Sequence, residues 1–172
     1  MEEYKFENGD VVDMKQLEAP PIIRADYNKA HQGLVIPCHD VFIQCEGGIL
    51  LVRRLDFPAK NILWPLGGRI ERGKTIEDSL RKKIRDEAGL ELGDIVEIGY
   101  ARTFFKTDPF GHNRGTDTIN FVFFGRGKGT LSLDESHKNP TIVLPRDYYT
   151  EYRDDLHPYV RRFMDLVIPM VK

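Results

Sequence analysis

Cysteine is scarce in this chain, which has only two in 172 residues. That number is too small for the disulfide framework of a compact secreted protein. Cys38 and Cys45 lie in one apolar segment at an odd spacing, so in a strand they would point to opposite faces. We expect both to be buried thiols of a protein in the reducing cytoplasm.

Strong net charge and long apolar runs are missing as well. The formal net charge is −2, so no basic field favours nucleic acid as a partner. No apolar run approaches the roughly 18–20 residues that cross a bilayer, and the polar start MEEYKFENGD is unlike a signal peptide. We therefore expect a cytoplasmic protein without a membrane partner, of a length that suits one domain.

The segments that are present predict an α/β domain built around a mixed sheet. Residues 1–33 are polar and interrupted by APP, which favours an N-terminal arm with one short helix, ahead of a single domain at 34–172. Apolar, β-branched segments predict strands at 34–45, 49–54, 95–105 and 119–127. Residues 130–144 are interpreted as a loop that returns to an apolar stretch.

Two helices are expected. In the first, Ile76, Leu80, Ile84 and Ala88 recur every four residues, with Thr75 as N-cap and Gly89 as stop. The second falls within 154–171. It would place these residues on one side: Tyr159, Phe163, Leu166 and Val167.

The segment GGRIERGKTIEDSLRKKIRDEAGL places a glycine pair directly before the first helix. Glycines there let the backbone approach a phosphate closely. Asp86 and Glu87 on the helix offer carboxylate oxygens, which suit Mg²⁺. Two adjacent acids also describe an ordinary solvated helix face, so this signal alone is weak.

The order of these parts resembles the Nudix box. The positions that fit are Gly68, Ile84, Asp86, Glu87, Gly89 and Leu90. Lys74 and Lys83 stand where the pattern has glutamates, and Lys82 replaces its arginine. The resemblance covers roughly residues 34 to 137 and implies an α/β/α sandwich around a mixed sheet. It also implies Mg²⁺-dependent cleavage of nucleoside diphosphates linked to another group.

The lysines change the chemistry that we expect of this box. Lys83 lies one turn before Glu87, so it could pair with that carboxylate and would repel a second cation. One Mg²⁺ held chiefly by Glu87 is compatible with such a helix, whereas a cluster of several metals is not. The ligands expected from the resemblance are Gly67, Asp86, Glu87 and Ser136.

Four further segments resemble the GDP-mannose mannosyl hydrolase branch of the Nudix family. They are DVFIQCEGGILLVRR, WPLGGR, GTDTINFVFF and LDESH, in the order of that branch. The resemblance implies that Asp40 lies on the sugar side and Arg54 on the diphosphate side, that Arg69 follows the glycine pair, and that His137 is the general base.

The same resemblance implies further residues and an oligomeric state. Ser136 takes the position of a glutamine metal ligand, and Phe121 is the nearest match to a tyrosine. The expected substrate-binding residues are Asp40, Arg54, Arg69, Lys82 and Phe121. Members of this branch tend to be dimers, so a homodimer is expected.

These residue types suit attack of water at the sugar C1 carbon. The transition state resembles an oxocarbenium ion, and negative charge grows on the departing diphosphate. Mg²⁺ and bidentate arginines neutralise that charge, while a histidine near neutral pKa takes the proton of the water. Taken singly, Arg54, Asp40 and His137 would equally suit a surface charge, a strand-terminal acid and an exposed loop histidine.

Three functions follow as hypotheses. The first is hydrolysis of GDP-mannose or GDP-glucose to GDP and sugar by attack at C1. The second is ordinary Nudix pyrophosphatase chemistry on a nucleotide sugar. The third is a nucleotide-binding module without turnover, which the lysine beside Glu87 favours.

Overall fold

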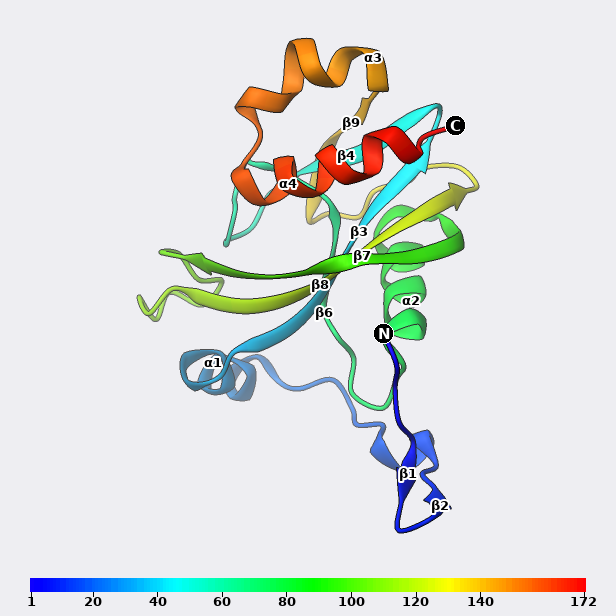
Figure 1. The fold of residues 1–172 in the computed structure, drawn as a ribbon. Helices are drawn as coiled ribbons and strands as arrows, with labels where there is room; N and C mark the ends of the chain where they lie inside the picture. The colour runs from blue at the N-terminus through cyan, green and yellow to red at the C-terminus, as the bar shows by residue number, and fades with distance from the viewer.

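A mixed sheet forms the centre of the molecule in the computed structural model, which describes residues 1–172 except for the side chain of Glu7 (Figure 1). The sheet order is β5-β4-β3-β8-β7, with β6 paired to β3 and β9 paired to β4. Its strands are β3 (Ile36–Cys45), β4 (Gly48–Arg54), β5 (Leu63–Trp64), β6 (Leu66–Arg69), β7 (Glu91–Phe105), β8 (Thr116–Lys128) and β9 (His137–Val143). Strands β3 and β8 run parallel and the other pairs antiparallel, so the predicted mixed sheet is confirmed.

Helices cover both faces of this sheet and give the expected three layers. Helix α2 (Ile76–Ala88) buries Leu80, Ile84 and Ala88 in one core cluster, against Val41 and Ile43 of β3. Helix α4 (Pro158–Val167) packs in a separate cluster on the other face, which is the face that Phe42 points to. Successive residues of β3 therefore alternate between the two helices, as the pleat of a strand requires.

The ends of α2 match the sequence pattern. The Thr75 side chain accepts a hydrogen bond from the Asp78 amide, and Gly89 closes the helix in the left-handed conformation at φ 67°. The Glu3 side chain of the N-terminal arm also accepts a hydrogen bond from the Ile76 amide. The capping residues predicted from the sequence are confirmed, and the contribution from Glu3 is an addition.

The sheet divides at the middle of β3. Its first half, Cys38–Val41, pairs with β6, and its second half, Ile43–Cys45, pairs with β4. The C-terminal part of β4 is therefore not paired with β3, and β6 pairs with the first half of β3 instead. The cavities described below are lined from both sides of this division.

Residues 137–143 differ from the sequence prediction, because they form β9 and not a loop. The strand pairs with β4, and Arg54 lies opposite His137 in the register. Pro140 hid this strand, since proline breaks a central strand but is tolerated where only one side is paired. His137 is consequently a strand residue whose side chain is only 7% exposed.

The C-terminal helix occupies only part of the predicted segment 154–171 and buries a different set of residues. Pro158 fixes its start, and the His157 ring accepts a hydrogen bond from the Tyr159 amide. Leu166 is 50% exposed, so the prediction that it faces the core was wrong. The segment before it forms α3 (Pro145–Asp147), a π turn (Tyr148–Tyr152) and a 3₁₀ turn (Arg153–Asp155), and a last 3₁₀ turn (Ile168–Met170) follows it.

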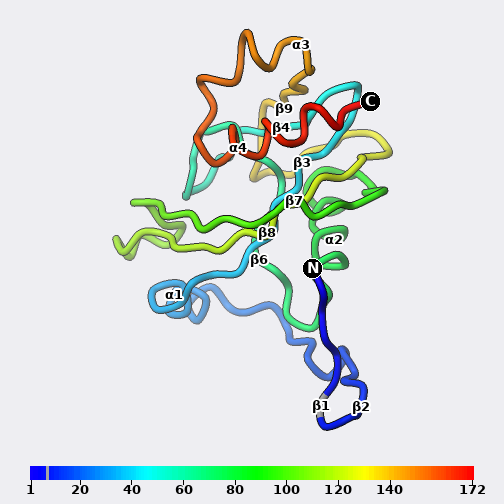
Figure 2. The backbone as a smooth tube through the Cα atoms, in the orientation of Figure 1, coloured from blue at the N-terminus to red at the C-terminus, as the bar shows by residue number. Residues whose placement is uncertain are grey.

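The N-terminal arm contacts the rest of the chain, and its path can be followed in Figure 2. It contains β1 (Phe6–Glu7), β2 (Asp10–Val11), a 3₁₀ turn (Met14–Leu17) and α1 (Arg24–Gly33). Glu18 pairs with Lys74 at 2.7 Å, and Arg72 donates to the Leu17 carbonyl at 2.9 Å. The division into an arm at 1–33 and a domain at 34–172 stays a prediction. Among the described residues, no helix combines the length and apolarity needed to cross a bilayer.

Candidate active site

Two adjoining cavities open where the sheet divides. The larger, of about 310 Å³, is lined by Tyr27, Arg54, Asp56, Gly67, Gly68, Arg69, Lys83, Glu87, Ser136 and His137. The smaller, of about 130 Å³, is lined by Tyr27, Cys38, Asp40, Arg54, Pro58, Ala59, Trp64, Gly68, Arg69, Thr103, Phe105, Thr118 and Asn120. Four lining residues are common to both, namely Tyr27, Arg54, Gly68 and Arg69, so the cavities meet at two arginines.

Gly67 is required by the close packing of β6 on β3. It lies opposite Asp40 in the register, at φ 156°. A Cβ atom there would come within 2.2 Å of the His39 carbonyl oxygen, which no side chain tolerates. The glycine pair therefore brings β6 close enough to β3 for Arg69 to lie beside both cavities.

A loop carries Asp134 to the end of helix α2. The Asp134 amide donates to the Glu87 carbonyl and the Ser132 amide to the Ala88 carbonyl, both at 2.9 Å. Carbonyls in the last turn of a helix have no partner within the helix, so these bonds fix the loop to α2. One ligand atom each of Glu87, Asp134 and His137 lies within 4.8 Å of the others.

Asp134 also orients His137. Its Oδ1 atom lies 2.8 Å from His137 Nδ1 and accepts a hydrogen bond from the Ser136 amide at 3.0 Å. A proton on Nδ1 satisfies the carboxylate and leaves Nε2 as an acceptor. This is the arrangement that a histidine general base needs.

Glu87 is nearly buried, at 9% exposure, and holds one strong partner. The Lys83 ammonium lies 2.8 Å from its Oε1 atom, while its Oε2 atom is buried without a hydrogen-bond partner. Burial raises the pKa of Glu87, and the positive charge of Lys83 opposes that rise. A buried, unpartnered carboxylate oxygen next to Asp134 and His137 fits a divalent cation.

The two arginines at the junction of the cavities have guanidinium groups available to bind an anion. Arg54 has a buried Nε atom without a hydrogen-bond partner. The Arg69 guanidinium lies 4.4 Å from the centre of the Tyr27 ring on α1. Stacking holds the planar fork in place while leaving its edge free, and such forks match phosphate oxygens.

Asp40 lies on the face of β3 that points to α4, and it lines the smaller cavity. Tyr159 on α4 donates a hydrogen bond to its Oδ2 atom at 2.5 Å, and Tyr159 stacks on Trp64 with ring centres 4.9 Å apart. Burial raises the pKa of Asp40 to about 6, against the lowering effects of Tyr159 and Arg54. This carboxyl can therefore change its proton state near neutral pH.

Three buried polar side chains form the floor of the smaller cavity. Thr103 of β7 bonds to Thr118 of β8 at 2.6 Å, and the Asn120 amide donates to both hydroxyls at 3.1 Å. We call these three residues the polar shelf. Hydroxyl and amide groups beside Trp64 and Phe105 offer both hydrogen bonds and an aromatic wall to a ligand.

The structure gathers most of the predicted site residues. The larger cavity holds Arg54, Gly67, Arg69, Glu87, Ser136 and His137, and the smaller holds Asp40. Lys82, Asp86 and Phe121 line neither. Lys82 and Asp86 pair with each other at 3.1 Å on the exposed side of α2. Phe121 is partly buried and packs against the core cluster beneath that helix.

Several residues at the site were missed in the sequence. Asp134 stood three residues before His137 within the segment LDESH, which is a usable signal. Tyr27 lies in the arm, and Tyr159 in a helix that was interpreted only for its packing side. The polar shelf joins two strands, so only the β7–β8 register reveals it.

Comparison with known proteins agrees with this fold. The family model for the NUDIX domain matches residues 39–165. The Low-salt glycan biosynthesis protein Agl8 of Haloferax volcanii is 25% identical over 130 residues, covering 73% of this chain and 78% of its own. The MutT NUDIX hydrolase of Burkholderia pseudomallei matches with a TM-score of 0.62 at 18% identity, over 78% of this chain and 98% of its own. The MutT protein of Methanosarcina mazei gives 0.59 at 21% identity, over 80% and 96%. The chain belongs to the Nudix family of hydrolases.

Proposed function

We propose that this Nudix hydrolase cleaves a nucleotide sugar by attack of water at the sugar C1 carbon, with GDP-mannose or GDP-glucose as substrate and Mg²⁺ as cofactor. One observation carries the proposal. A histidine with its tautomer fixed by Asp134 lies in the same cavity as Glu87 and two arginines.

Each side chain then has a definite task. His137 accepts the proton of the attacking water at Nε2, and Asp134 stabilises the imidazolium that results. Arg54 and Arg69 bind the diphosphate at the junction of the cavities. Glu87 would hold the divalent ion through its unpartnered Oε2 atom, with Asp134 close by and with Ser136 and Gly67 lining the same cavity. The ion supplies further neutralisation of the departing diphosphate.

The smaller cavity supplies groups for sugar hydroxyls. Asp40 and the polar shelf face it from β3, β7 and β8. Hydrogen bonds to several hydroxyls select a sugar more sharply than an apolar wall does, because a wrong sugar leaves buried polar groups without partners. The sugar would bind against this floor with C1 near Arg54.

One observation favours attack at carbon over attack at phosphorus, and a second favours a sugar-containing substrate. Lysines occupy two carboxylate positions of the box, and each already pairs with an acid: Lys74 with Glu18 and Lys83 with Glu87. Cleavage of a phosphate anhydride by ordinary Nudix enzymes draws on several metal-binding carboxylates of this helix. The name of the Haloferax relative refers to glycan biosynthesis, which supports a sugar-containing substrate.

Hydrolysis in ¹⁸O-labelled water distinguishes the two bonds. We expect label in the released sugar and none in the nucleotide. Label in the nucleotide would contradict attack at C1 and would support the pyrophosphatase alternative.

Substitution of Glu87 tests turnover itself. In a panel of nucleotide sugars with Mg²⁺, we expect Glu87→Gln to lower kcat by roughly a hundredfold or more, because the ion loses its buried ligand. Glu77→Gln on the exposed side of the same helix is the control and should match the wild type. If no nucleotide sugar in the panel releases its sugar in the presence of metal, the protein would be a binding module without turnover. The Lys83–Glu87 pair motivates that alternative.

A further inference from the structure

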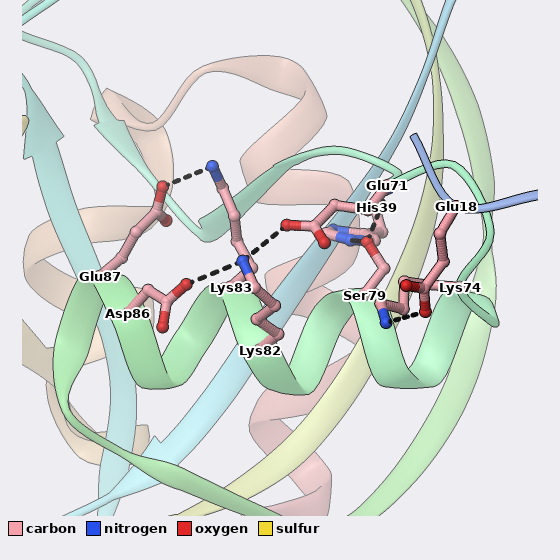
Figure 3. A network of polar contacts seen from close by, with 9 residues as sticks. All are labelled: Glu18, His39, Glu71, Lys74, Ser79, Lys82, Lys83, Asp86 and Glu87. Carbon is pink, nitrogen blue, oxygen red and sulfur yellow. Dashed lines mark hydrogen bonds and ion pairs between the residues drawn. The ribbon is translucent and has the colours of Figure 1, made fainter. Parts of the chain in front are cut away.

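Lys83 is the unusual feature of this site. Figure 3 shows its side chain reaching Glu87 one turn along α2, whereas Lys82 reaches Asp86 and Glu71. A lysine that precedes its acid by four residues is the weaker order for helix stability. Stabilisation of the helix alone is therefore a weak reason for a lysine at this position.

The surroundings of the ammonium group point to a ligand. A Cβ atom on Gly68 would lie 3.0 Å from Lys83 Cε and 3.4 Å from Nζ, so the lysine crosses the glycine pair. Its side chain is 33% exposed, and it lines the larger cavity together with Arg54 and Arg69. Three cationic side chains thus surround the space into which the glycine pair opens.

Two acids, Asp56 and Glu87, line the larger cavity against these three cations. Lys83 uses one oxygen of Glu87, and the other oxygen is buried without a partner. The nearby Asp134 is already engaged with His137. Arg54 and Arg69 have no ion pair among the described residues, and Arg54 keeps a buried nitrogen without a partner.

We propose that Lys83 is a tethered counter-ion for the diphosphate. Its ammonium group replaces part of the positive charge that metal ions bound to this helix would supply. The protein therefore binds a diphosphate without the divalent ion. The same charge lowers the affinity of Glu87 for that ion. The inference rests on the proposed function only in taking a diphosphate as the ligand, and it does not depend on which bond is cleaved.

Two binding measurements on Lys83→Met test it without turnover. Titration of inorganic pyrophosphate in EDTA, by calorimetry, should give an affinity about tenfold weaker than that of the wild type, because one of three cations is lost. Titration of Mn²⁺ without any anion, by electron paramagnetic resonance, should give an affinity about fivefold tighter or more.

The controls separate charge from structure. Lys83→Arg keeps the charge and should hold both affinities within about twofold of the wild type. Lys74→Met removes the other lysine at a carboxylate position, outside both cavities, and should change neither. Thermal unfolding verifies that each variant is folded, and Lys83→Gln replaces Lys83→Met where the latter does not fold.

Changes of opposite sign support the proposal. Loss of both affinities together would assign Lys83 a structural role and overturn it. An unchanged affinity for pyrophosphate would also overturn it, as would a wild-type protein that binds pyrophosphate only with the metal. Release of nucleotide sugar products plays no part in these readouts, so failure of the proposed reaction leaves them intact.

Discussion

At the scale of single residues, the two cavities are lined by buried polar atoms without hydrogen-bond partners, which destabilise a fold. Four buried side-chain atoms lack a hydrogen-bond partner among the described residues, and two of them, Arg54 Nε and Glu87 Oε2, belong to residues that line the larger cavity. Each such atom destabilises the fold by about 1–3 kcal/mol. A ligand that bonds to them would recover this free energy, so their position marks the site.

Asp40 gives a prediction about stability against pH. Its pKa rises from 3.8 to about 6 on folding because it is buried, so the folded state binds more protons between these values. The wild type should therefore lose up to about 3 kcal/mol of unfolding free energy as the pH rises through this window. Asp40→Asn has no carboxyl to titrate at this position, so its unfolding free energy should not show this loss.

Urea unfolding at pH 4.5 and pH 7.5 should detect about 2 kcal/mol of this change, because most of the window lies between these two pH values. The free energy of unfolding of Asp40→Asn relative to the wild type should increase with pH. The kcat/KM of this variant should be lower than that of the wild type. A relative stability that is independent of pH would contradict a buried, ionisable Asp40. Greater stability together with lower activity is the usual outcome at a functional residue.

Single residues also set the limit of sequence reasoning at this site. Asp40, Arg54, Arg69 and His137 were identified by matching short segments, and the structure places all of them at the two cavities. Phe121 came from the same matching, yet its neighbour Asn120 lies in the cavity. A shift of one residue in a strand exchanges the two faces, and pattern matching alone does not fix that register.

At the scale of elements, helix α2 was well predicted and β9 was not. The apolar spacing of α2 and its cap are local signals, so a short window contains them. Strand β9 exists because it pairs with β4, and Pro140 disguises that pairing. Without β9, no local pattern places His137 opposite Arg54 or its ring against Asp134.

The loop between β8 and β9 yields a prediction at this scale. Main-chain bonds to Glu87 and Ala88 fix this loop on α2, so Asp134→Asn leaves its position intact and changes only the carboxylate. An amide holds His137 less well in the tautomer that exposes Nε2. We expect kcat to fall by roughly a hundredfold with little change in KM, and the unfolding free energy to change by about 1 kcal/mol or less.

Steady-state kinetics with thermal unfolding checks this prediction. Ser132→Ala, in the same loop, keeps the main-chain bond and serves as control. A kcat near the wild-type value in Asp134→Asn would remove Asp134 as the residue that orients the base. A large loss of stability would instead assign it to the loop itself.

At the scale of the whole molecule, the N-terminal arm joins the site although the family match begins at residue 39. Helix α1 packs on the loop between β7 and β8: His31 bonds to His112 at 2.9 Å, and Arg24 donates to the Pro109 carbonyl at 3.1 Å. This contact positions Tyr27 against the Arg69 guanidinium. The arm therefore completes one wall that both cavities share.

Tyr27 then becomes the test of whether the arm takes part in binding. Its ring holds the Arg69 guanidinium, and a contact of this kind contributes about 0.5–2 kcal/mol. We expect Tyr27→Ala to raise KM for the nucleotide sugar about three- to tenfold with kcat nearly unchanged, because Arg69 binds the substrate but takes no proton. Tyr27→Phe keeps the ring and should retain most of the affinity. Steady-state kinetics on both variants decides the matter: equal KM values for Tyr27→Ala and the wild type would confine binding to the family domain. A rise in KM confined to Tyr27→Ala would mean that residues outside the matched domain help to hold the diphosphate.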